Sequence, residues 1–127
     1  MQRLSRLLST RPGRRRSHVW QDSRGNYHML AHFFGREDDD AGRNPGGHAF
    51  SADLREWTFA GQAYGMNVTW DDGTRETMIR RERPFVLLVN GTPAYLFNAV
   101  TPPKPANSAE LSTPMGRSYT MAAPIAR

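Results

Sequence analysis

The 127-residue sequence contains no cysteine, a single lysine (Lys104) and no long apolar run. The absence of cysteine excludes a disulfide framework and a thiolate metal site, and it argues against a redox role. No apolar stretch approaches the roughly 18 residues that a membrane-spanning helix requires, so we expect no membrane partner. A hydrophobic content of 38% is enough for one domain with a modest core. We expect no cofactor.

The formal net charge of +5 is concentrated at one end of the chain. Without the arginines that precede Ser17, 11 basic residues stand against 12 acidic ones, so the body of the chain is close to neutral. The arginines of this tail are Arg3, Arg6, Arg11, Arg14, Arg15 and Arg16. A basic tail without a basic face or an aromatic platform does not indicate a nucleic-acid-binding domain, so nucleic acid is not the expected partner.

Residues 1–17 differ in composition from the rest of the chain. Leucines at helical spacing, arginine and serine, followed by a break at Pro12-Gly13, are typical of an organelle transit peptide. An unstructured leader ahead of a truncated domain would have the same composition, so both interpretations stay open. No secretory signal peptide is evident, which leaves the cytoplasm or an organelle as the compartment. We divide the chain into this leader at 1–17 and a folded domain at 18–127.

After the leader, short aromatic and aliphatic runs alternate with turn residues, which is typical of β-structure. We predict four hairpins, with strands at 18–21 and 27–34, 47–51 and 57–59, 68–70 and 76–80, and 85–89 and 94–100. Asn90-Gly91 is the clearest turn, because both residues tolerate positive φ. The proline-rich stretch 101–114 is predicted to be a loop, and 118–123 a last strand. Because no amphipathic helix follows the leader, we predict an antiparallel all-β fold.

Two stretches resemble a known family. The first, VWQDSRGNYHMLAHFF followed by GGHAFSADLREW, resembles a blade of the five-bladed β-propellers of glycoside hydrolase families 43 and 32. In such a blade Asp53 would turn the chain, and Trp57 would pack between neighbouring blades. The second, RRERPFVLLVNGTPAYLFNAV, is similar to the strand pair that begins with Glu-x-Pro and carries the general acid in the same enzymes. The terminal SYTMAAPIA resembles their closing strand.

The resemblance covers about residues 18–125 and implies about two blades and a closing strand of a propeller that hydrolyses O-glycosyl bonds. It implies that Glu82, which stands before Arg83-Pro84, is the general acid. It also implies that a carbohydrate is the partner and that the substrate-binding residues are His32, His48, Arg81 and Asn98.

The sequence departs from the family where catalysis needs further carboxylates. The family keeps a general base and an aspartate that tunes the acid, but Arg15-Arg16-Ser17 stands where the tuning aspartate would be, and the blade with the base is absent. Inverting hydrolysis needs an acid and a second carboxylate roughly 6.5 to 9.5 Å apart. We therefore expect a glycoside hydrolase-like fragment, with missing N-terminal blades and an incomplete catalytic set, that is inactive alone. The alternatives are a non-catalytic carbohydrate-binding or interaction module that self-associates through exposed blade edges, and a basic-tailed organellar protein.

Each candidate residue also has an ordinary interpretation. Glu82 could be a surface carboxylate paired with neighbouring arginines, the histidines could be ordinary hydrogen-bonded side chains, and the tryptophans could be core residues. His28 and His32 are four residues apart, and on a strand they lie about 13 Å from each other, too far to share a metal ion. The acidic run Asp38-Asp39-Asp40 lacks the spacing of a calcium loop. We therefore predict no metal site.

Overall fold

The computed structural model describes residues 17–32, 46–103 and 118–126. Within these ranges the chain is all-β, its strands pair antiparallel, and it has no helix. The strands are β1 (Ser17–Gln21), β2 (Tyr27–His32), β3 (Gly46–Ser51), β4 (Thr58–Tyr64), β5 (Asn67–Thr69), β6 (Arg75–Thr77), β7 (Arg80–Val89), β8 (Thr92–Thr101) and β9 (Tyr119–Pro124). The prediction of an antiparallel all-β fold is confirmed. The leader, the acidic run at 38–40 and most of the proline-rich stretch lie outside the described residues.

The first sheet has the strand order β1-β2-β3-β4, so the first two predicted hairpins join into a single four-stranded meander. In the turn of the first hairpin, the Asp22 Oδ1 atom accepts hydrogen bonds from the backbone N–H groups of Arg24 (2.9 Å) and Asn26 (3.0 Å). Gly25 has a φ of 86°, a conformation that glycine adopts without steric cost. These local bonds explain why the turn residues Asp22–Asn26 could be recognised in the sequence.

The connection between β3 and β4 confirms the predicted role of Asp53. Its Oδ1 atom accepts hydrogen bonds from the backbone of Arg55 (2.9 Å) and Glu56 (3.0 Å), so its carboxylate holds the turn. Trp57, next along the chain, is buried and packs with Met29 and Ala49 on the outer face of the first sheet. Burial of Trp57 is therefore observed, whereas its packing between propeller blades stays a prediction.

The remaining strands form the β5–β6 hairpin and a three-stranded sheet with the order β7-β8-β9. Asn90 and Gly91 have φ values of 51° and 75°, which confirms the tight turn expected between β7 and β8. Three predicted boundaries were wrong. The strand expected at 57–59 extends to Tyr64. The strand expected at 76–80 ends at Thr77, and β7 begins at Arg80 rather than at residue 85, because a bulge with positive φ at Arg83 accommodates Pro84 within the strand.

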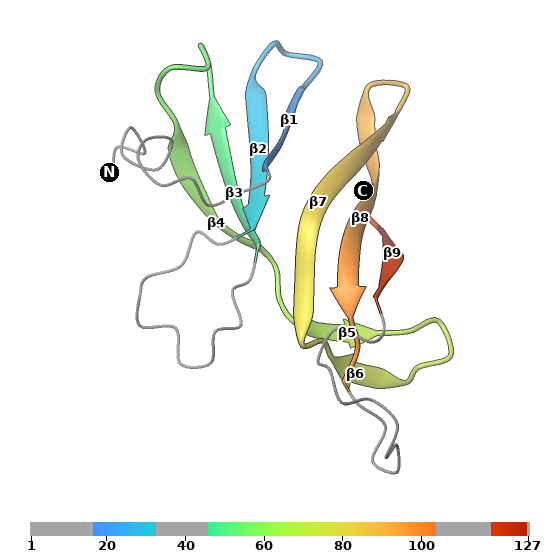
Figure 1. Cartoon of the computed structure of the whole chain (residues 1–127). Coiled ribbons are helices and arrows are strands. Elements are labelled where there is room, and N and C mark those ends of the chain that lie inside the picture. The colour runs from blue at the N-terminus through green and yellow to red at the C-terminus, as the bar shows by residue number, and fades with distance from the viewer. Residues whose placement is uncertain (1–16, 33–45, 104–117, 127) are drawn as a thin grey trace.

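The first sheet packs against the β7–β9 sheet, with the β5–β6 hairpin across one end of the latter (Figure 1). Leu30 and Tyr64 of the first sheet share a core with Val86 and Leu96. A second core lies under the hairpin, and its buried residues are Met78, Val100 and Met121. The partly buried residues Met66, Val68 and Trp70 pack against them. These sheets do not close into a barrel or a propeller over the part of the chain that the structure describes, so the propeller blades stay a prediction.

None of the described elements is a helix with the length and apolar character needed to cross a membrane.

Candidate functional site

Three of the predicted site residues lie together at the start of β7. Arg81 is only 7% exposed, and its Nε atom donates a hydrogen bond of 2.9 Å to Oδ1 of Asn98, which is 1% exposed. The Nδ2 atom of Asn98 in turn donates to the backbone carbonyl of Glu82 (3.3 Å). The Nη1 atom of Arg81 donates to the carbonyl of Gly65 (2.9 Å). We call these four residues, together with Tyr64, the Arg81 cluster.

Tyr64 closes one side of the Arg81 cluster. The Arg81 guanidinium carbon lies 4.6 Å from the centre of its ring, which is cation–π geometry. Burial raises the pKa of Tyr64 to about 12; Asn98 and Arg81 oppose this rise, and the Glu82 carboxylate adds to it. The buried hydroxyl oxygen of Tyr64 has no hydrogen bond of good geometry from the described residues, although the Asn98 side chain lies close to it.

The charge of Arg81 is not balanced by a direct ion pair. No carboxylate lies within ion-pair distance of its guanidinium in the described ranges, and only two of its five N–H donors have hydrogen-bond partners there. Burial lowers the pKa of Arg81, although the nearby Tyr64 opposes the shift. A buried cation is costly unless polar groups compensate it, so the remaining donors favour a polar ligand.

Glu82 follows Arg81 in β7 directly before the bulge, and its carboxylate is near enough to the Tyr64 hydroxyl to raise the pKa of that group. The Glu82 side chain is partly buried, and its Cα lies opposite Ala99. Arg83, which follows, has a φ of 51° and forms the bulge. The bulge re-aims the strand directly after Glu82, a device that recurs next to functional sites.

A second polar group runs across β1, β2 and β3. The Nε2 atom of His28 lies 2.9 Å from Oδ2 of Asp22, and the Nδ1 atom of His28 lies 3.0 Å from Nε2 of His48. We call Asp22, His28 and His48 the histidine chain. The Trp20 ring is nearly parallel to both imidazoles, with centroid distances of 5.1 Å to His28 and 6.1 Å to His48.

The two ends of the histidine chain differ in their electrostatics. The hydrogen bond from His28 is the main cause that lowers the pKa of Asp22 to about 2. At the other end, burial and the neighbouring His28 lower the pKa of His48. At neutral pH the chain therefore begins at a carboxylate and ends at a neutral imidazole.

The structure separates the predicted site residues into two places. Arg81, Glu82 and Asn98 lie in the Arg81 cluster, whereas His48 lies in the histidine chain. The Cα of His32 pairs with that of Gly46 at the end of β2, and its side chain lies outside the described part of the structure. The five predicted residues are therefore not shown to form one site.

The sequence interpretation missed Tyr64 and Gly65 in one group and the roles of Asp22 and His28 in the other. Tyr64 could not be found because a Tyr-Gly pair at the end of a strand has no particular signature. His28 reaches His48 only through the β2–β3 register, and the connection from 33 to 45 gives no sequence signal for that register.

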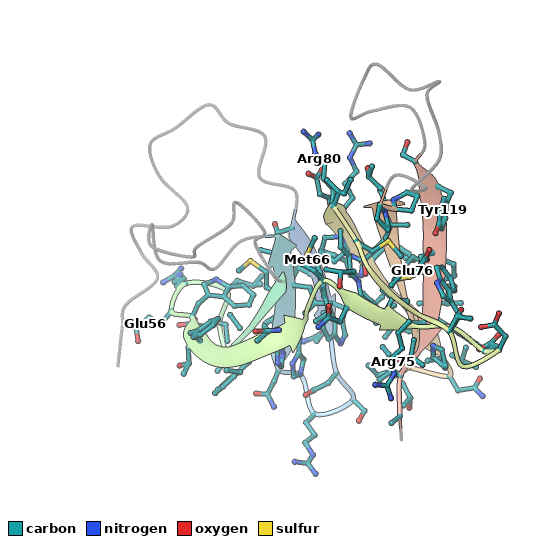
Figure 2. The ribbon with its side chains drawn as sticks, turned by 90° about the horizontal axis from the view of Figure 1, so that it is seen from below. Glu56, Met66, Arg75, Glu76, Arg80 and Tyr119 are labelled. Atoms are coloured by element: carbon teal, nitrogen blue, oxygen red, sulfur yellow. The ribbon has the colours of Figure 1, made fainter. Side chains whose placement is uncertain are left out.

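A third polar contact lies at the β5–β6 hairpin. The Nε1 atom of Trp70 donates to Oε2 of Glu76 (2.7 Å), and the Trp70 ring lies 6.3 Å from that of Tyr119. Figure 2 shows Glu76 and Tyr119 on the same side of the molecule, with Glu56 at the other side. Because Trp70 also packs on the core under the hairpin, this contact orders the hairpin.

Comparison with known proteins found no matching family model, no similar curated protein and no similar solved structure. No three side chains of the metal-binding types come together among the residues that the structure describes. The fold therefore places the chain in a class, all-β proteins of packed antiparallel sheets. The Arg81 cluster and the histidine chain are its two candidate sites.

Proposed function

We propose that the chain is a carbohydrate-active module of the glycoside hydrolase type, with its sugar-binding site at the Arg81 cluster. The observation that carries this proposal is the convergence of Arg81, Glu82 and Asn98 at the start of β7. Sugars bind through hydroxyl groups that both donate and accept hydrogen bonds. The cluster offers guanidinium donors, carboxylate acceptors and an amide that does both.

Unsatisfied groups in the Arg81 cluster give the proposal further support. Buried polar atoms in proteins nearly always have a hydrogen-bond partner. The Tyr64 hydroxyl lacks one of good geometry, and Arg81 uses only part of its donor set within the described residues. A sugar carries several hydroxyl groups and can satisfy both side chains at once.

The cluster supports binding more directly than cleavage. Glycoside hydrolysis needs two carboxyl groups, and Glu82 is the only carboxylate of the cluster. The chain alone is therefore proposed to bind a sugar without hydrolysing it, with Glu82 in the position of the acid of a larger, complete site.

Calorimetric titration with xylobiose tests sugar binding. We expect Glu82→Gln to weaken binding roughly tenfold, because a charged hydrogen bond to a ligand contributes about 1.5 to 3 kcal/mol. The control is Glu56→Gln, because Glu56 is exposed and lies in the β3–β4 connection, outside the Arg81 cluster. Equal affinities in the two variants, or no binding by the unmodified chain, would contradict the proposal. We also expect no cleavage of aryl arabinosides or xylosides, and cleavage that Glu82→Gln abolishes would show a complete catalytic site instead.

Self-association is a second candidate function, and the outer face of the β7–β9 sheet favours it. Three large apolar side chains on this face of β7 and β8 are exposed: Leu87, Val89 and Tyr95. Apolar patches of this kind mark interaction surfaces. The inner face of the same sheet packs against the first sheet of this chain. We expect a sheet from a second copy to pack on the outer face in the same way.

Sedimentation equilibrium of the full chain tests this second candidate. We expect a concentration-dependent dimer or larger oligomer that Leu87→Glu converts to a monomer. Leu54→Glu is the matched control, because Leu54 is also exposed (47%, against 39% for Leu87) but lies in the β3–β4 turn. An unmodified chain that is monomeric at all concentrations would exclude self-association.

A further inference from the structure

In the histidine chain, the donor and the acceptor of each hydrogen bond can be assigned in order, starting from Asp22. Asp22 is ionised at neutral pH, because its pKa is held at about 2. A carboxylate only accepts hydrogen bonds, so the Nε2 atom of His28 carries a proton and donates it to Oδ2 of Asp22. A neutral His28 then has a lone pair on Nδ1, and this atom has to accept.

The same reasoning continues to the next ring. The partner of His28 Nδ1 is Nε2 of His48, at 3.0 Å, so His48 donates from Nε2. A neutral imidazole carries one N–H, and His48 has used it. The Nδ1 atom of His48 is therefore left with a lone pair, and no hydrogen bond reaches that atom from the described residues.

Space for a ligand lies beside His48. Its register partner in β4 is Gly61, and a side chain at Gly61 would meet no atom within 4 Å. Phe50, two residues along β3, is 43% exposed. Trp20 lies parallel to the His48 ring. The imidazole of His48 thus adjoins an open position over Gly61.

We propose that the histidine chain makes Nδ1 of His48 a hydrogen-bond acceptor for a ligand hydroxyl, bound over Gly61 as a second subsite of the sugar-binding module. The choice of a sugar hydroxyl rests on the proposed function. The direction of the chain rests on the contacts among Asp22, His28 and His48, together with the ionised Asp22 carboxylate and a neutral His28.

The histidine chain can also take up a proton without leaving the charge on His48. A proton that binds to Nδ1 of His48 allows its Nε2 proton to pass to Nδ1 of His28. The positive charge then lies on His28, whose Nε2–H remains bonded to the Asp22 carboxylate at 2.9 Å. The proton is thus taken up at Nδ1 of His48, while the positive charge lies on the ring of His28.

Few other titratable groups face His48. From β1, the ring of Trp20 lies parallel to that of His48, and His18 lies beside Trp20, where burial lowers the pKa of His18. From β4 the register partner is Gly61, and β7 brings the apolar residues Phe85 and Val86 to His18. Protonation at His48 is therefore governed by its own chain, and His18 is a third imidazole beside Trp20.

The variant Asp22→Asn tests the direction of the chain. Oδ1 of the residue caps the turn by accepting from Arg24 and Asn26, so the new amide will keep its oxygen there and present its NH₂ group to His28. His28 then has to accept at Nε2 and donate from Nδ1, and His48 has to carry its proton on Nδ1. The variant reverses both tautomers while it keeps the turn.

Long-range ¹H–¹⁵N correlation spectra at pH 8 measure these tautomers. We expect both His28 and His48 to be protonated at Nε2 in the unmodified chain and at Nδ1 in Asp22→Asn. Asp53→Asn is the control, because Asp53 caps the β3–β4 turn in the same way and has no hydrogen bond to a histidine among the described residues. A purely structural role would leave the tautomers of the variant unchanged. Protonation of His48 at Nδ1 in the unmodified chain would overturn the inference.

Titration of the labelled protein with xylobiose tests the ligand. The inference expects the His48 ring nitrogens to shift and the shift at Nδ1 to fall at least fivefold in Asp22→Asn. Shifts at Asn98 without any at His48 would support the proposed function and overturn this inference. Shifts at His48 without any at Asn98 would support this inference and contradict the Arg81 cluster as the sugar-binding site. A spectrum that xylobiose leaves unchanged would contradict both.

Discussion

Gly46 in β3 lies directly beneath the ring of Tyr64 in β4. A Cβ atom built on Gly46 would clash with the Cδ1, Cε1 and Cζ atoms of this ring. The ring also receives the Arg81 guanidinium on its face. The absence of one side chain therefore positions Tyr64, and through it the Arg81 cluster.

We expect Gly46→Ala to destabilise the protein by about 1 to 3 kcal/mol, because the ring can avoid the added methyl group only by moving out of its packed position. Urea unfolding followed by tryptophan fluorescence measures this change. Gly65→Ala is the control, since its added Cβ would meet only the end of the flexible Gln62 side chain, at 3.1 Å. Equal stability of the two variants would show that Tyr64 is not held by this contact.

At the scale of the element, the short β5–β6 hairpin depends on the core beneath it. It has only three paired residues on each strand, and an isolated hairpin is at best marginally stable in water. Met78, directly after β6, is fully buried against Val100 and Met121. The backbone N–H of Met78 donates to the carbonyl of Met66 at 2.8 Å, which closes the base of the hairpin.

Met78→Ala is expected to lower the free energy of unfolding by about 2 to 4 kcal/mol, the range for large-to-small changes in a core. The neighbouring Ile79→Ala should cost less than half as much, because Ile79 is exposed. Urea midpoints of the two variants at equal protein concentration make the comparison. Similar losses in both variants would mean that the hairpin is not held by this core.

The elements also show where sequence patterns were sufficient. Turns whose residues bond to their own backbone, such as Asp22–Asn26 and Asn90-Gly91, were located correctly because their chemistry is local. The start of β7 was misplaced because Pro84 normally interrupts a strand, and the compensating bulge at Arg83 has no local signal. Arg81 and Asn98 were predicted through a family resemblance, and their direct contact arises from the β7–β8 pairing.

For the whole molecule, the interface between the sheets contains imidazoles. His18 lies 4.6 Å from the Phe85 ring, and its buried Nε2 atom has no hydrogen-bond partner among the described residues. Burial lowers the pKa of both His18 and His48 from the ordinary value of 6.5. A group whose folded pKa is lowered stabilises the fold above its unfolded pKa, and that contribution is lost as the pH falls.

We therefore expect stability to be constant above about pH 6.5 and to fall as the pH drops below that value through the lowered pKa values of His18 and His48. A second loss should begin near pH 3.8, as the pH falls toward the folded pKa of Asp22 at about 2. Thermal unfolding from pH 8 to pH 3 measures the profile. His18→Phe should make the first decline shallower, and a protein more stable at pH 5 than at pH 8 would refute this expectation.

The sequence by itself determined the β-class, the short-range turns and the neutral character of the chain outside its basic tail, because turn chemistry, strand alternation and charge depend on residues close together. Only the tertiary structure decided that the first two hairpins share a sheet, that Tyr64 packs on Gly46, and that His28 joins Asp22 to His48. These contacts depend on the pairing of strands that are distant in sequence. Register and packing are properties of the assembled sheets, and no local pattern encodes them.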